Sequence, residues 1–344
     1  MIHIVGAGMG GTYLGKLFLD EGIDFKIYEK RGKPLCHCAW GIMYDLAKKY
    51  AKRIGYDFEE YIISKPSRVI INGVETKMEN VVIFDRPRWL SDLWKDLESN
   101  IVLRYKYSEG DMDGANLIVD ATGTSRYVME MVGNRITEDR FLFTIEKRII
   151  VDDLDSDYVY IYGRPYGYAW LFPLGDRDWH FGAGAPTQDQ VYKLMSGLIE
   201  MTHLYRYGID CLCKPKIRYI IPRELNIIHL RPYVAAIGEA GGFVSGFGEG
   251  NLLAMETAEI LYKCLGWNYY NVENSLYCYR YYVMEKMKWI RYQHEMIKAM
   301  NKNILYVIPK LPKVLKIAKQ RSRIKVNPIK MIKILWRVLR GEYK

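Results

Sequence analysis

The first thirty residues, "MIHIVGAGMGGTYLGKLFLDEGIDFKIYEK" (1–30), decide the fold class. Residues 2–5 predict a short buried strand, and residues 25–29 predict a second strand. Between the two strands, a turn with the spacing G-x-G-x-x-G opens an apolar-faced helix; its glycines are Gly6, Gly8 and Gly11. This strand–turn–helix–strand order is typical of dinucleotide-binding folds.

Each glycine of this motif has its own physical task. The first permits the turn, the second lets the backbone approach a pyrophosphate, and the third packs the helix against the strand. The N-terminus of the helix offers free N–H groups and a positive dipole end to the phosphates. Glu29, 18 residues after Gly11, ends the second strand where a carboxylate can hold ribose hydroxyls. An acid there disfavours the 2′-phosphate of NADP, so the motif predicts FAD or NAD.

A second glycine-rich loop favours FAD. Residues 117–123, "LIVDATG", predict an apolar strand that ends in small residues. A later strand at 233–237 is followed by Gly238-Glu239-Ala240, a glycine-rich loop and a helix from about Gly250. This loop comes more than 200 residues after the first, which indicates a ligand with two ends to hold. FAD has that length: its adenosine and pyrophosphate would lie at the first site, and its ribityl chain and isoalloxazine at the second.

An aromatic stretch, "PYGYAWLFPLGDRDWHFGAG" (165–184), raises a separate question. Alternating aromatics are followed by a proline and, after eight intervening residues, by two glycines: Tyr168, Trp170 and Phe172, then Pro173, then Gly182 and Gly184. The alternation predicts a strand with the aromatic rings on one face. Such rings usually pack in a core. The pattern alone leaves a packing role and a binding role both open.

Together these segments resemble the FAD-dependent geranylgeranyl reductase family, within the p-hydroxybenzoate hydroxylase-like flavoproteins. The aromatic stretch matches that family's signature P-x-x-Y-x-W-x-F-P, eight residues, then G-x-G. The resemblance spans residues 1 to about 265. Its other matches are Glu29, Lys30 and Arg31, then Cys38 and Gly41, then Arg86 and Trp89. The chain departs from the family at Glu239, where an aspartate is usual, at Gly246, where proline is common, and in its shorter C-terminal part.

The resemblance implies an α/β fold class and a division of the chain. A Rossmann-type FAD-binding domain carries an inserted antiparallel-sheet substrate domain and is followed by a helical C-terminal region. The FAD-binding domain is predicted at 1–60, 85–125 and 231–265, and the substrate domain at 61–84 and 126–230. The helical region is 266–344, and it ends in a basic amphipathic tail.

The resemblance also implies the site residues. Cofactor contacts are expected from Gly6, Gly8, Gly11, Glu29, Lys30, Arg31, Cys38, Gly41, Arg86, Ala121, Gly123, Gly238, Glu239, Gly248, Gly250 and Asn251. An apolar isoprenoid channel is expected along Tyr168, Trp170, Phe172 and Pro173, with Gly182 and Gly184 letting the chain pass close to backbone. Cys38 is the candidate catalytic residue, which would shape the site or relay a proton, although a buried structural cysteine is equally common. No metal is expected.

The implied activity is saturation of C=C bonds in geranylgeranyl or other isoprenoid chains, by hydride transfer from N5 of reduced flavin. Two alternatives remain: a flavin-dependent monooxygenase or halogenase on the same scaffold, and a non-catalytic flavin electron carrier or lipid-binding protein. The sequence has no second G-x-G-x-x-G motif for a nicotinamide nucleotide. A small redox protein and NADH are therefore both open as electron donors.

Charge is concentrated in the tail. Residues 298–344 carry 14 Lys or Arg and one acid, a net of +13, whereas the whole chain is +10, so the rest is −3. Within the tail, Pro328 and Gly341 predict the start and stop of a helix whose four basic residues share an arc of about 80°. We expect this helix to lie on a membrane surface. The alternatives are a helix docked on its own domain and, third, an RNA contact; no nucleic-acid module is recognised, and nucleic acid is not an expected partner.

Cysteine usage and hydropathy indicate the compartment. There are six cysteines, among them two Cys-x-Cys pairs, Cys36/Cys38 and Cys211/Cys213. We interpret the cysteines as thiols, with a zinc site as a minor alternative. No apolar run approaches the roughly 18 residues of a membrane span, and an apolar strand begins at residue 2. The expected location is the cytoplasm, peripheral at the inner face of the membrane.

Overall fold

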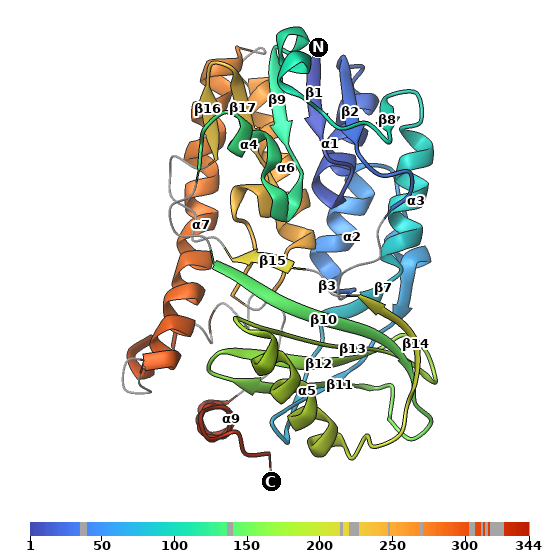
Figure 1. Ribbon diagram of the computed structural model, residues 1–344, viewed down its shortest axis with the longest axis vertical. Helices are drawn as coiled ribbons and strands as arrows, with labels where there is room; N and C mark the ends of the chain where they lie inside the picture. The colour runs from blue at the N-terminus through green and yellow to red at the C-terminus, as the bar shows by residue number, and fades with distance from the viewer. Residues whose placement is uncertain are drawn as a thin grey trace.

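The computed structural model describes residues 1–34, 40–135, 140–213, 216–219, 227–246, 248–267, 271–302, 307–310, 312–313, 316 and 327–343. Figure 1 shows a mostly parallel sheet at one end of the long axis and an antiparallel sheet at the other. A small sheet of three antiparallel strands adjoins both in that view: β3 (Gly41–Met43), β7 (Val81–Phe84) and β4 (Ile62–Ser64).

The parallel sheet is built on the N-terminal motif. Its order is β16-β17-β9-β1-β2-β8, and only the pair β16–β17 is antiparallel. The strands are β1 (Ile2–Val5), β2 (Phe25–Glu29), β8 (Ile101–Leu103), β9 (Leu117–Asp120), β16 (Ile228–Leu230) and β17 (Tyr233–Ala236). Because β1 pairs in parallel with both β2 and β9, the residues that follow these strands meet at one edge of the sheet.

Helices cover this sheet and bury its apolar residues. The main ones are α1 (Met9–Asp20), α2 (Tyr44–Arg53), α3 (Arg86–Asp96), α4 (Tyr127–Met131), α6 (Asn251–Trp267) and α7 (Val272–Lys302). Leu14, Leu17 and Phe18 of α1 are buried in one large core with α3 and α6. The apolar positions predicted for the first helix therefore face that core.

The antiparallel sheet has the order β14-β10-β13-β12-β11-β5-β6, and β15 also pairs with β10. Its strands are β5 (Arg68–Ile71), β6 (Val74–Lys77), β10 (Arg140–Ile150), β11 (Tyr158–Arg164), β12 (Gly167–Pro173), β13 (Asp178–Ala185), β14 (Gly208–Cys213) and β15 (Lys216–Tyr219). The helix α5 (Gln188–Thr202) packs on one face and closes a second core. The helix α5 does not cover the other face of the sheet, which is turned toward the half of the molecule that contains the parallel sheet.

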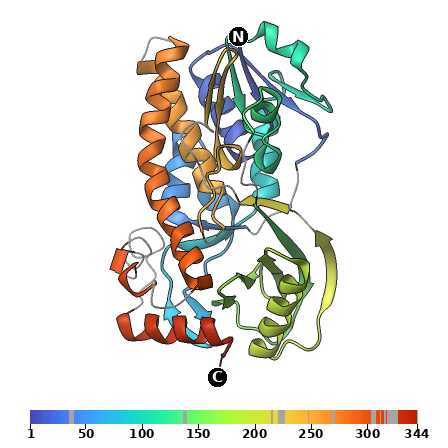
Figure 2. The ribbon, with the colours of Figure 1, turned by 60° about the vertical axis from the view of Figure 1, so that its left-hand side comes forward.

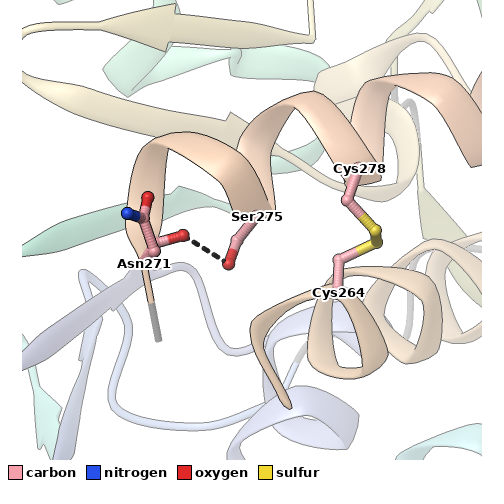
Figure 3. Close-up of a disulfide and its surroundings, with 4 residues drawn as sticks. All are labelled: Cys264, Asn271, Ser275 and Cys278. Carbon is pink, nitrogen blue, oxygen red and sulfur yellow. Dashed lines mark hydrogen bonds between the residues drawn. A yellow bond between two sulfur atoms is a disulfide. The ribbon is translucent and has the colours of Figure 1, made fainter. Parts of the chain in front are cut away.

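The two long C-terminal helices are joined by a disulfide. Cys264 of α6 and Cys278 of α7 are bonded, with their Cα atoms 5.6 Å apart (Figure 3). Asn271 directly precedes α7, and its carbonyl oxygen accepts a hydrogen bond from the Ser275 hydroxyl at 2.8 Å. The prediction that the cysteines are thiols is wrong for this pair. The pairing depends on two helices reversing direction side by side, and 14 residues of sequence separation do not reveal that.

The tail helix α9 (Pro328–Arg340) has the predicted bounds and packs on the body of the protein. Asn327 accepts a hydrogen bond from the N–H of Lys330, and Gly341 ends the helix at φ +71°. Ile334 and Val338 are buried against Val74 of β6. Leu335 is buried against α7 and Val307, so its side chain does not face outward. The buried side of α9 therefore agrees with the alternative of a helix docked on its own domain.

The predicted fold class is confirmed: a Rossmann-type parallel sheet, a separate antiparallel sheet and C-terminal helices. The proposed division into three segments stays a prediction. Among the described residues, no helix is both long enough and apolar enough to cross a membrane.

Candidate functional site

The glycine turn between β1 and α1 has the shape that a phosphate cradle needs. Gly6 has φ +105°, and a Cβ there would lie 2.5 Å from the carbonyl oxygen of Ala121. A Cβ on Gly11 would collide with the carbonyl oxygen of Gly6. A Cβ on Gly8, in contrast, would meet nothing within 4 Å. Two glycines therefore let backbone pack on backbone, and the third leaves open space at the N-terminus of α1.

Glu29 ends β2 beside this turn and is 2% exposed. Its carboxylate accepts hydrogen bonds from the N–H of Ala7 at 2.9 Å and from the N–H of Arg31 at 3.0 Å. The Arg31 guanidinium adds two more, Nε at 2.7 Å and Nη2 at 3.1 Å. Burial raises the pKa of Glu29, but these donors outweigh burial and hold the pKa below its ordinary value. A ribose could use Glu29 only if the Arg31 side chain moved aside.

The helix α3 supports the turn from the other side. The indole N–H of Trp94 donates to the carbonyl of Ala7 at 2.9 Å, from a fully packed position. Arg86, the predicted cofactor contact, is the first residue of α3 and is half-buried. Trp89 packs in the core beneath it. Sequence reasoning selected Arg86 and missed Trp94. The signal for Trp94 was an indole on the apolar face of the helix that Arg86 begins.

The second glycine segment meets the end of β9. The short 3₁₀ helix η5 (Gly238–Gly241) follows β17, and η3 (Gly123–Ser125) follows β9. The Glu239 carboxylate accepts a hydrogen bond from the Thr124 hydroxyl at 2.8 Å. It also lies 3.6 Å from where a Cβ on Gly123 would stand. The longer acid thus bridges the two turns, and its carboxylate lies at the sheet edge that holds the first glycine turn.

Two glycines of the loop that follows η5 are closely packed. The N–H of Gly246 donates to the Gln293 side chain at 3.0 Å, and a Cβ on Gly246 would lie 2.8 Å from Ile297 of α7. Glycine at this position is explained by the close approach of α7. Gly248 has φ +80°, and a Cβ there would lie 2.6 Å from the hydroxyl oxygen of Tyr168. The helix α6 then begins at Asn251, as predicted.

The aromatic strand β12 turns its rings toward that loop. Tyr168, Trp170 and Phe172 lie on one face, with ring centroids 5.5 and 6.4 Å apart in succession. Ala169 and Leu171 point to the opposite face and pack in the core beneath α5. Desolvation raises the pKa of Tyr168 to about 12. These three rings are here named the aromatic wall, in which Tyr168 approaches Gly248 and Phe172 approaches Gly41.

The two glycines of β13 serve this wall in a way that the sequence did not predict. Gly182 pairs with Trp170 across the sheet, and a Cβ on Gly182 would collide with the indole ring. Gly184 lies against Thr144 of β10. The space beside Gly182 is therefore filled by Trp170 itself. A flat ring covers the backbone at that position, and the expected passage of a ligand along it stays a prediction.

Two buried indole N–H groups at the wall have no hydrogen-bond partner within the described part of the chain: those of Trp40 and Trp170. Trp40 immediately precedes Gly41, and a Cβ on Gly41 would stand 3.6 Å from the Phe172 ring. A buried donor without an acceptor costs free energy on the order of 1–3 kcal/mol. These donors are the positions from which the wall can bind an acceptor atom of a ligand.

A buried acid–base pair adjoins the same wall. His180 of β13 and Glu146 of β10 are 4% and 5% exposed, and the Nδ1 of His180 lies 2.8 Å from the Glu146 carboxylate. The His180 ring also packs on Trp40, with centroids 4.4 Å apart. His180 pairs with Phe172 across the strands, so it belongs to the aromatic face of the sheet. Sequence reasoning assigned no role to His180, because Glu146 is 34 residues away and meets it only through strand pairing.

Comparisons with known proteins show what this chain is similar to. No family model matches the chain. An uncharacterised protein of Methanocaldococcus jannaschii is 23% identical over 87% of this chain and 92% of its own length. A digeranylgeranylglycerophospholipid reductase of Methanosphaerula palustris is 26% identical over 53% of this chain, and the match spans about half of that relative's length (55%).

Solved structures give the fold. A geranylgeranyl bacteriochlorophyll reductase-like protein of Thermoplasma acidophilum superposes with a TM-score of 0.68 at 15% identity, covering 97% of this chain and 95% of its own. A probable FAD-dependent monooxygenase of Pseudomonas aeruginosa gives 0.69 at 15% identity, covering 90% and 99%. A flavin-dependent halogenase, CmlS, gives 0.65 at 13%, covering 97% and 70%. The chain has the fold of these flavoproteins.

In this flavoprotein fold, the predicted residues gather in two groups. Gly6, Gly8, Gly11, Glu29, Arg31, Ala121, Gly123, Gly238 and Glu239 lie around the edge formed by β1, β2, β9 and β17. Gly41, Tyr168, Trp170, Phe172 and Gly248 form the junction between the two halves, and Gly250 and Asn251 follow at the start of α6. Lys30 is exposed beside the first group. Cys38 lies outside the described residues, so its predicted role stays a prediction.

Proposed function

We propose that the protein is an FAD-dependent reductase that saturates C=C bonds of geranylgeranyl or related isoprenoid chains, in membrane lipids or their precursors. The observation that carries this proposal is the aromatic wall placed against the second glycine loop, with Tyr168 packed on Gly248. The reductase name of the Methanosphaerula palustris relative supports the same reaction class. A monooxygenase or halogenase remains the alternative, because proteins so named share the fold.

The residues present fit FAD. The open space at Gly8, at the N-terminus of α1, suits a pyrophosphate, and the N–H groups there would bind its oxygens. Glu239 and the loop from Gly248 to Asn251 would hold the other end of the cofactor. When bound, reduced FAD supplies hydride to one carbon of the double bond. The backbone N–H groups at the start of α6 would stabilise negative charge on the ring.

The aromatic wall would exclude water and orient the apolar chain. Trp170 and Phe172 offer flat apolar surface, and the strand fixes their positions more firmly than a loop would. The indole N–H groups of Trp40 and Trp170 would donate to an acceptor of the cofactor or of a polar lipid group, which removes the cost of burying them unpaired.

We propose His180 as the holder of the proton that completes the reduction. Saturation of the double bond would also require a proton at the second carbon, which receives the π-electron pair. A His180 imidazolium can supply that proton, and Glu146 is the positioning residue that holds the ring through Nδ1. Solvent then restores the proton after each turnover.

The function is tested by anaerobic incubation with dithionite and geranylgeranyl lipids, followed by mass spectrometry. A reductase adds two hydrogens per saturated bond. Oxygen insertion with NADH or NADPH under air would show a monooxygenase instead, and halide incorporation a halogenase. Flavin that cycles between redox states without any lipid product would show an electron carrier. Dithionite makes the result independent of the physiological donor, for which a small redox protein and NADH both remain open.

The proton role has its own test. His180→Gln should lower turnover by about 10²-fold or more, with unchanged flavin content and unchanged reduction by dithionite. Glu146→Gln should lower turnover less, because the imidazole remains but is held less firmly. A matched control is His203→Gln, an exposed histidine at the end of α5. Full turnover in His180→Gln would remove this residue from the mechanism and leave the reductase proposal standing.

A further inference from the structure

The outward face of α9 carries apolar side chains that the protein leaves exposed. Ile329, Ile332 and Trp336 are 78%, 60% and 49% exposed. Their spacing of three and then four residues puts them on one side of the helix. The opposite side, with Ile334 and Val338, is buried against the body. One helix thus has two apolar sides, of which the protein covers one.

Basic side chains border the exposed apolar side. Lys330 and Arg337 are tied to the body, donating to the carbonyls of Glu75 and Asn72 at 2.9 Å each. Lys333 and Arg340 are exposed. The Arg340 guanidinium lies 4.0 Å from the centroid of the Trp336 ring and 3.6 Å from the Glu342 carboxylate. The exposed side therefore combines an apolar strip with cations along its edge.

The position of α9 in the molecule suits contact with a flat surface. Figure 2 shows it lying across one end of the long axis, beside the antiparallel sheet and roughly perpendicular to that axis. A plane brought against this end would meet the helix along its length. The parallel sheet lies at the far end of the molecule, away from such a plane (Figures 1 and 2).

We propose that this outward face of α9 docks on an anionic lipid bilayer. The apolar strip would enter the interface between headgroups and acyl chains, with Trp336 at the depth that indoles favour. Lys333 and Arg340 would contact lipid phosphates, and the net charge of +13 in residues 298–344 would draw the protein to the surface. A second copy of the chain fits less well, because two such faces would bring like charges together.

The test is co-sedimentation of the whole protein with vesicles of phosphatidylcholine containing about a third phosphatidylglycerol, at low and moderate salt. The double variant Ile332→Ser/Trp336→Ser should bind at least about tenfold more weakly, with an unchanged melting temperature, because both side chains are exposed. Lys333→Gln/Arg340→Gln should weaken binding mainly at low salt. The control Tyr205→Ser/Ile209→Ser removes two side chains that are exposed elsewhere, 68% and 57%, and should bind like wild type.

Several results would overturn the proposal. Wild-type protein that stays in the supernatant with these vesicles would do so, as would equal binding by wild type and the Ile332/Trp336 variant. A dimer in light scattering that the same variant converts to a monomer, without vesicle binding, would assign the face to self-association. Vesicle binding does not involve flavin or lipid reduction. Its failure would leave the proposed reaction untouched, and the reverse also holds.

Discussion

The glycine turn of residues 6–11 and the aromatic wall on β12 belong to opposite halves of the molecule, and their residues are constrained in different ways. In the turn, the close approaches are to backbone: Gly11 lies against the carbonyl of Gly6, and Gly6 lies against that of Ala121, just after β9. In the wall, the close approaches to glycine are made by side chains: Gly182 lies under the Trp170 ring, and Gly248 lies against the Tyr168 hydroxyl. The glycine spacing of the turn is visible in the sequence, whereas the neighbours of the wall's side chains are set only by how strands and loops pack.

The largest effect is expected where backbone touches backbone. Gly11→Val should abolish folding, or cost more than about 3–4 kcal/mol, because the side chain would collide with the Gly6 carbonyl. Soluble expression and thermal unfolding measure this. A folded Gly11→Val protein with a near-normal melting temperature would mean that the turn tolerates a different path.

Gly8→Val separates binding from folding in the same turn. A Cβ at this position meets no protein atom within 4 Å, so we expect the protein to fold normally. It would fill the space assigned to the pyrophosphate, and the purified variant should lose most of its bound FAD. Absorbance near the flavin bands, with circular dichroism as the folding control, gives the answer. Stoichiometric FAD in Gly8→Val would contradict the placement.

Trp170 tests whether the wall serves packing or binding. Trp170→Ala removes a ring that is 7% exposed and should destabilise the protein by about 3–5 kcal/mol. Trp170→Phe keeps most of the apolar surface and removes the unpartnered N–H. We expect Trp170→Phe to stay folded and to turn over isoprenoid substrate roughly tenfold more slowly. This factor corresponds to the loss of about one hydrogen bond.

The outcome of that pair decides between the two roles. Equal turnover in Trp170→Phe and wild type, together with unfolding of Trp170→Ala, would leave the wall with a packing role only. Phe172→Leu is a gentler companion change, since Phe172 is only partly buried and borders Gly41.

The smallest effect is expected at Glu29. Glu29→Gln removes a buried carboxylate that accepts four protein hydrogen bonds, and should cost roughly 1–3 kcal/mol at pH 7. Because the folded-state pKa lies below the ordinary value of 4.5, the carboxylate stabilises the fold above that pH. This contribution falls as the pH drops through the folded-state pKa. Melting temperatures of the two proteins should therefore converge as the pH falls from 4.5 through the folded-state pKa of Glu29. A gap that widens in acid would contradict this assignment.

The N-terminal strand–turn–helix–strand unit and the bounds of the tail helix could be predicted from the chain alone. They depend on residues close together in the chain: glycines at fixed spacing, an acid at the end of the next strand, and Pro328 and Gly341 at the two ends of α9. Each is a rule of local backbone geometry, so the sequence can state it without knowing what packs around it.

The remaining features depend on contacts between segments that are far apart in the chain. Strand pairing brought His180 to Glu146 and laid Trp170 over Gly182. The reversal between α6 and α7 joined Cys264 to Cys278. Packing on β6 and α7 chose which apolar side of α9 is buried and left Ile329, Ile332 and Trp336 outside. An amphipathic pattern shows that a helix has apolar sides. Which of them the protein covers depends on α7 and on β6, whose Glu75 lies 255 residues before Lys330.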